Sequence, residues 1–135
     1  MNMFRRTILR FGAGIASAAV LATLPLRAMA ATWNKAGFDA KTATDAMKTL
    51  GVANAAESRD IVITAPDIAE NGAVVPVAIT SRIPNTQSIS IVAEKNPFPL
   101  AATFDISGTS EAYVSTRLKM GQTSNVRAVV KADGR

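Results

Sequence analysis

The carboxylates of Asp67 and Glu70 stand three residues apart in this 135-residue sequence, a spacing that could serve acid–base chemistry. A proline precedes the pair and a glycine follows it, which indicates a solvated loop between strands. Glu57 and Asp60 are interpreted in the same way, as the solvated entrance to a strand. The sequence has no Cys and no His, which excludes disulfides, Cys/His zinc sites and Ser-His-Asp or Cys-His catalysis. No catalytic residue, metal site or cofactor is predicted, and we expect a protein that is not an enzyme.

The net charge of +5 comes almost entirely from the first thirty residues. These residues hold four arginines and no acid, whereas residues 31–135 carry 11 basic and 10 acidic groups. A nearly neutral body is not typical of a nucleic-acid-binding domain, so no nucleic-acid partner is expected.

Four basic residues near the C-terminus nevertheless occupy outward-facing positions of the predicted strands. Arg117, Lys119, Arg127 and Lys131 would align on the outer faces of two neighbouring strands, if those strands pair. Only Tyr113 supplies an aromatic ring nearby, so the stacking platform of a nucleic-acid binder is missing. We interpret the group as a solubilising face or as the rim of a site for an acidic partner.

The N-terminal segment has the layout of a cleaved export signal. Arg5 and Arg6 are followed by one residue, two apolar residues and a basic residue, which is the twin-arginine export pattern. The later uncharged stretch of sixteen residues is shorter than the roughly 20 that span a bilayer, and Ala28 and Ala30 are the small residues that a signal peptidase needs before Ala31. We expect residues 1–30 to be a signal peptide, the mature chain to begin at Ala31, and the protein to reach the periplasm without a membrane anchor. An ordinary secretory signal and a retained amphipathic anchor are the alternatives.

One short helix and six strands are predicted in residues 31–135. From an N-cap at Asp39, apolar residues recur at helical spacing as far as Leu50, and Gly51 ends the helix. Beyond it the hydrophobic period changes to two, with turn signals between the runs. The predicted strands are 61–64, 73–79, 89–93, 103–107, 112–120 and 125–132. This order predicts an all-β fold, an immunoglobulin-like antiparallel β-sandwich with a short N-terminal helix, in one domain.

The dipeptide Asp133-Gly134 after the last strand is a strong hairpin signal, because both central residues of a type I′ turn need φ > 0. Only Arg135 follows it. This pattern predicts a hairpin whose second strand is missing, with a frayed, exposed tail as the alternative.

The segment Asn96-Pro97-Phe98-Pro99-Leu100 is extended and preorganised by its two prolines. Two interpretations stay open. Phe98 either docks into a partner, or it anchors a loop that crosses between the sheets by inserting into the core.

Three stretches of the mature chain, residues 61–80, 94–104 and 115–134, resemble the SoxY family of thiosulfate-oxidation carrier proteins. The resemblance implies an immunoglobulin-like sandwich that forms a heterodimer with a second small β-protein, SoxZ, in the periplasm. In that family a flexible C-terminal arm ending in Gly-Gly-Cys-Gly-Gly holds sulfur intermediates covalently on its cysteine and presents them transiently to the Sox enzymes. A twin-arginine export signal is also usual there.

This sequence departs from the family pattern at the arm. It contains no Cys, and it ends at Arg135, where the resemblance implies one more strand and then the arm. With the unfinished hairpin, this predicts a chain that is incomplete at its C-terminus and in which no residue takes the carrier role. The expected function is that of the sulfur carrier subunit of the Sox system. The alternatives are an arm-less periplasmic interaction module and, disfavoured by the lack of His or clustered carboxylates, a hydrolase.

Overall fold

The computed structural model of the chain describes residues 32–52 and 55–134. The predicted signal peptide lies outside these residues, and so do Arg5, Arg6, Ala28, Ala30 and Ala31. The export predictions are therefore not tested by the fold.

Two short helices open the described part of the chain. They are α2 (Lys35–Asp39) and α3 (Ala43–Thr49). The predicted helix corresponds to α3, and Gly51 follows it with φ +75°, as a helix-ending glycine should. The predicted N-cap Asp39 is wrong, because this residue is the last one of α2. Thr42, with extended backbone angles, caps α3 instead.

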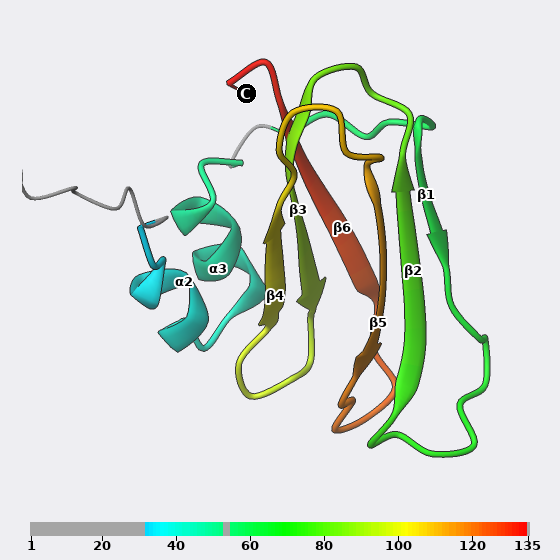
Figure 1. Cartoon of the computed structure of the whole chain (residues 1–135). Helices are drawn as coiled ribbons and strands as arrows, with labels where there is room; N and C mark the ends of the chain where they lie inside the picture. The colour runs from blue at the N-terminus through cyan, green and yellow to red at the C-terminus, as the bar shows by residue number, and fades with distance from the viewer. Residues whose placement is uncertain (1–31, 53–54, 135) are drawn as a thin grey trace, which may run out of the picture. The chain divides into compact units, whose positions relative to one another are not determined.

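In the described residues, six strands form two antiparallel three-stranded sheets (Figure 1). They are β1 (Ile61–Thr64), β2 (Val75–Ser81), β3 (Thr86–Ala93), β4 (Leu100–Asp105), β5 (Tyr113–Leu118) and β6 (Val126–Ala132). The β2 sheet has the order β1-β2-β5, and the β3 sheet has the order β4-β3-β6. The predicted immunoglobulin-like sandwich is confirmed, although the fourth strand starts three residues earlier than the sequence pattern indicates.

The inward side chains of the two sheets make the main core. Val77 and Ile79 of β2 and Ile89 and Ile91 of β3 are at most 1% exposed. The predicted inward residues of β6 also pack against this cluster, namely Val126, Ala128 and Val130. In β2, β3 and β6 the alternation of period two therefore identified the residues that face the main core, since successive side chains of a strand point to opposite sides.

The helices cover the outer face of the β3 sheet, beside β3 and β4 (Figure 1). Ala46 of α3 forms a second buried cluster there with Val92 and Leu100. The two helices approach each other closely at Gly37, where an added Cβ would lie 2.6 Å from Thr49 Oγ1. A side chain at this position would have to displace the Thr49 hydroxyl and the Asn34 side chain, which caps α2.

The segment before β4 does not anchor Phe98 in the core. Phe98 is 48% exposed, and the neighbouring Pro99 is buried in its place. The Lys41 ammonium lies 3.4 Å from the centre of the Phe98 ring, within the range of a cation–π contact. The core-anchor interpretation is therefore wrong for Phe98, and Pro99 holds the loop.

The predicted basic patch does not form. Arg117 and Lys119 belong to β5 and its end, whereas Arg127 and Lys131 belong to β6, and these two strands lie in different sheets. Arg127 instead forms an ion pair with Glu94 at the end of β3. The sequence pattern could not show that these residues lie apart, because outward-facing positions do not determine which strands are neighbours.

Candidate functional site

The carboxylate pairs do not form an acid–base site. Asp67 and Glu70 are exposed in the loop between β1 and β2, and Glu57 and Asp60 are exposed before β1. Within residues 32–52 and 55–134, no cluster of three or more Asp or Glu side chains could hold a metal ion. A shallow hollow of about 180 Å³ beside β1, β2 and β5 is lined by side chains that do not titrate. The solvated-loop interpretation of both pairs agrees with this exposure.

The turn that follows β6 is the most specifically built feature among the described residues. Asp133 and Gly134, called the β6 turn below, have φ values of 50° and 78°. Positive φ at both central residues is the backbone of a type I′ hairpin turn, as the Asp-Gly signal predicts. Asp133 and Asn85 are the non-glycine residues with positive φ in the described part of the chain, and they contact each other.

Two side chains contact the β6 turn, Asn85 from the loop before β3 and Gln87 from β3 itself. Asn85 Nδ2 donates a hydrogen bond to Asp133 Oδ1 over 2.9 Å, and the Gly134 amide donates to Gln87 Oε1 over 2.9 Å. Gln87 reaches the turn from an irregular point of the sheet, since the β3–β6 register shifts between Thr86 and Ser88. A bulge of this kind re-aims the side chain of the extra residue.

A network of hydroxyl groups supports the loop that carries Asn85. Thr86 Oγ1 donates to the Ile83 carbonyl over 2.8 Å, which uses its one hydroxyl proton. The Ser81 hydroxyl, 2.8 Å away, is therefore the donor to Thr86 Oγ1, and it also accepts from the Ile83 amide over 3.2 Å. Ser81 is 9% exposed, so the network lies at the edge of the core. These hydrogen bonds hold the backbone of the β2–β3 loop, which contains Asn85.

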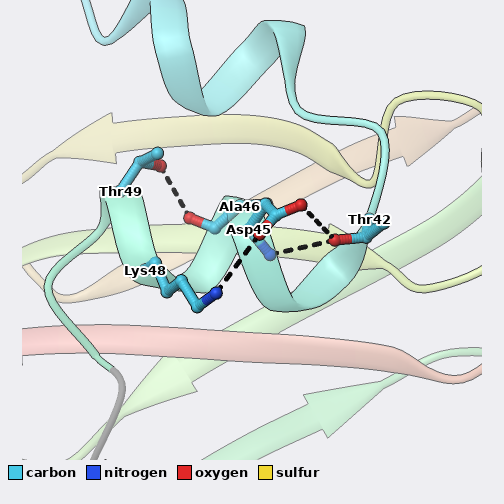
Figure 2. Close-up of polar contacts among 5 residues, drawn as sticks. All are labelled: Thr42, Asp45, Ala46, Lys48 and Thr49. Carbon is cyan, nitrogen blue, oxygen red and sulfur yellow. Dashed lines mark hydrogen bonds and ion pairs between the residues drawn. The ribbon is translucent and has the colours of Figure 1, made fainter.

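The pKa of Asp45, at the start of α3, is lowered by contacts that also cap the helix. Figure 2 shows the Thr42 hydroxyl, which donates to Asp45 Oδ2 over 2.8 Å while accepting from the Asp45 amide over 3.1 Å. The Thr42 hydrogen bond, and secondarily Lys48, lower the pKa of Asp45 below its ordinary value. The same view shows Thr49 Oγ1 donating to the Ala46 carbonyl over 2.7 Å. These contacts satisfy groups at both ends of a seven-residue helix, which explains why it is stable in this position.

The comparisons with known proteins decide the family. The family model described as sulfur oxidation protein SoxY matches residues 46–135. The chain belongs to the SoxY family. A solved structure, the sulfur carrier protein SoxY from Chlorobium limicola f thiosulfatophilum, is 44% identical to this SoxY-family chain, with a TM-score of 0.52. The match covers 57% of this chain and 70% of that one. Among curated proteins, no match is found.

The SoxY match includes all six strands and the second half of α3, and it extends over the β6 turn. The resemblance seen in the sequence is thus confirmed at the level of the family. This SoxY-family chain contains no Cys, so none of its residues offers the thiolate on which sulfur could be carried covalently. No helix in the described part of the SoxY fold is long and apolar enough to cross a membrane.

Sequence reasoning missed Asn85 and Gln87 as the partners of the SoxY-family turn. The dipeptide Pro84-Asn85 between two strands is a turn signal, and Asn is the residue that most readily joins glycine at positive φ. That signal could have placed Asn85 in a turn. It could not show the contact with Asp133, which is 48 residues away and depends on the pairing of β3 with β6.

Proposed function

We propose that this protein is the sulfur carrier subunit of a periplasmic thiosulfate-oxidation system. In this proposal the described sandwich is the scaffold, and the carrier cysteine lies on a C-terminal arm that is absent from residues 1–135. The observation that carries the proposal is the SoxY match over residues 46–135, together with 44% identity to a protein described as a sulfur carrier.

Covalent sulfur carriage in this proposal does not require reactive side chains on the scaffold. A carrier needs one thiolate nucleophile on a mobile tether, and glycine is the residue that gives the backbone such freedom. Oxidation and hydrolysis of the bound sulfur belong to other enzymes, so the carrier itself is not a catalyst.

Partners and location follow from the same proposal. The partner is a SoxZ-like small β-protein in a heterodimer, and the Sox enzymes bind transiently while they act on the arm. The protein is exported by the twin-arginine signal at Arg5 and Arg6, is cleaved after Ala30, and begins at Ala31 in the periplasm. It binds neither nucleic acid nor, after cleavage, membrane.

Purification from the periplasm of cells grown on thiosulfate tests the proposal. The gene is left at its own locus with an affinity tag inserted after Ala31, and the eluted complex is identified by mass spectrometry. We expect a one-to-one complex with a small β-protein. Recovery of the protein from the cytoplasm, or as a monomer in thiosulfate-grown cells, would contradict the proposal. A stable complex whose subunits never take up thiosulfate sulfur would favour the arm-less interaction module instead.

A further inference from the structure

We propose that Phe98 and the lysines of the adjoining loops form a docking surface for a protein that presents an apolar pocket bordered by carboxylates. This surface, called the Phe98 surface below, consists of Lys41, Lys95, Phe98 and Lys119. It lies where the β3–β4 loop, the β5–β6 loop and the loop between the helices meet, at one end of the sandwich (Figure 1). The inference goes beyond the proposed function, because it requires neither the carrier cysteine nor any sulfur chemistry.

Phe98 is displayed on a restrained segment. Its side chain is 48% exposed, and it stands between Pro97, which is also exposed, and Pro99, which is buried. The two prolines fix their own φ angles, and the Pro99 carbonyl accepts a hydrogen bond from the Ala93 amide over 2.8 Å. Because this segment is already ordered, insertion of the ring into a partner would cost little conformational entropy. The ring therefore has the character of a preorganised anchor.

Hydrogen bonds tie the β3–β4 loop to the β5–β6 loop. Asn96 Nδ2 donates to the Lys119 carbonyl over 2.8 Å. The Lys95 amide donates to Ser124 Oγ over 3.0 Å, and the Lys95 carbonyl accepts from Gln122 Nε2 over 3.2 Å. The backbones of Lys95 and Lys119 are thus held in neighbouring loops, while their ammonium groups take no part in these contacts.

Three exposed lysines accompany the ring, namely Lys41, Lys95 and Lys119. Among the described residues, none of the three forms an ion pair. The Lys41 ammonium lies over the Phe98 ring, 3.4 Å from its centre. Lys95 is in the same loop as the ring, and the Lys119 carbonyl contacts the residue after Lys95. The apolar anchor therefore has positive charge in its own loop and in both adjoining loops.

The loops that form the Phe98 surface have a net positive charge. They are residues 40–42, 94–99 and 119–125, with three lysines and a single acid. That acid, Glu94, is already neutralised by an ion pair with Arg127 of β6. The exposed Asp67 and Glu70 lie in a different loop, between β1 and β2, and pair with no described lysine. Electrostatic complementarity then requires Asp or Glu on the docking partner, and these charges would also steer its approach.

A protein fits this surface better than a nucleic acid or a membrane. One aromatic ring offers no platform for successive stacked bases. Three lysines fall short of the polybasic clusters that bind anionic lipid. An aromatic anchor with a charged rim is, in contrast, the usual anatomy of a protein–protein interface. The occupant is therefore a protein pocket that receives the ring of Phe98 and faces the lysines with its carboxylates.

Four variants separate the anchor from the charges. Phe98→Ala removes the ring, and Tyr113→Ala is its matched control, since Tyr113 is 49% exposed on β5. Lys95→Glu reverses one charge without disturbing the loop, because the hydrogen bonds of the loop use the Lys95 backbone. Lys131→Glu is the control for charge reversal, at an exposed position of β6 outside the Phe98 surface.

Photo-crosslinking identifies the docking partner in cells that express the protein from its own gene. The photoreactive residue p-benzoylphenylalanine replaces Phe98, or Tyr113 as the control, and the crosslinked peptides are mapped by mass spectrometry. We expect the Phe98 position to crosslink into an apolar pocket of another protein, with Asp or Glu at the rim of that pocket. The Tyr113 position should not reach this pocket.

Binding of the purified partner to the full chain is then measured by surface plasmon resonance. Phe98→Ala should weaken the complex about 30-fold, the size of a typical hot spot. Lys95→Glu should slow association about tenfold at low salt and much less at high salt, because screening removes the steering. Exchange of the facing Asp or Glu of the partner for Lys should restore the association rate. Tyr113→Ala and Lys131→Glu should behave like the parent.

The inference would be overturned by the lack of an adduct at the Phe98 position, or by an adduct on lipid, nucleic acid, a second copy of this chain or a pocket without acidic residues. Equal effects of Phe98→Ala and Tyr113→Ala, or an unchanged association rate in Lys95→Glu, would also overturn it. Circular dichroism shows whether each variant folds, and Phe98→Leu, which removes the ring but stays apolar, decides if Phe98→Ala does not fold. Because only binding is measured, these outcomes are independent of whether the protein carries sulfur.

Discussion

Truncation of Ile79 tests the observed sandwich most sharply. Ile79 lies in the middle of the central strand β2, opposite Ile63 of β1 and Val114 of β5, and its side chain is completely buried. Ile79→Ala deletes three carbon atoms from the core where both sheets meet. We expect it to be among the most destabilising single changes in the domain.

The expected loss has two contributions. Transfer of three methylene-sized groups costs about 2.4 kcal/mol, at roughly 0.8 kcal/mol each. The unfilled cavity adds to this, which gives about 3–4 kcal/mol, inside the roughly 2–5 kcal/mol seen for such truncations. For a domain of this size the melting temperature should fall by about 12–32 °C, at roughly 4–8 °C per kcal/mol. Ile79→Val should cost only about 1 kcal/mol.

Urea unfolding followed by circular dichroism measures these losses, with an unchanged m-value as evidence that only stability has changed. Ile68→Ala is the matched control, because Ile68 is 86% exposed and the same truncation there should stay within about 0.5 kcal/mol. Equal effects of Ile79→Ala and Ile68→Ala would refute the placement of Ile79 at the centre of the core.

Two further predictions concern the N-terminal half of the chain. Replacing Arg5 and Arg6 with Lys should abolish export by the twin-arginine route, because the receptor recognises guanidinium groups. Cell fractionation measures the export of this variant, and normal export would indicate the ordinary secretory route. Thr42→Val should raise the pKa of Asp45 toward its ordinary value, because the hydroxyl that chiefly lowers this pKa is lost. A lowered folded-state pKa contributes stability at neutral pH that disappears as the pH falls through the carboxyl range, so Thr42→Val should reduce this loss on acidification. NMR titration of Asp45 and urea unfolding against pH measure both effects, with Thr44→Val as the control; an unchanged pKa in Thr42→Val would contradict the hydrogen-bond explanation.

The strands could be predicted from the sequence because their pattern has a direct physical cause. Burial of one sheet face forces apolar residues into alternate positions, so Val77, Ile79, Ile89 and Ile91 identify the core before any contact is known. Turn chemistry is equally local. The positive φ values of Asp133 and Gly134 follow from the dipeptide itself.

The failures share another cause, which is dependence on contacts distant in sequence. Asp39 and Thr42 are both good N-cap residues, and only the packing of two short helices determines which one is used. The predicted basic patch would form only if β5 and β6 were adjacent strands, and the alternation of residues along each strand does not determine which strands are adjacent. The contact of Asn85 with Asp133 likewise appears only after β3 and β6 pair.

Intact-mass spectrometry and peptide mapping test the central claim, a sulfur carrier scaffold, most directly. The protein is isolated from the periplasm of cells that express it from its own gene, before and after thiosulfate is supplied. The account predicts a protein that begins at Ala31 and gains a reducible, thiosulfate-dependent mass on a cysteine of the proposed arm, outside residues 1–135, which contain no Cys. A thiosulfate-dependent adduct on any residue from 31 to 135, or no adduct while thiosulfate is being oxidised, would contradict it.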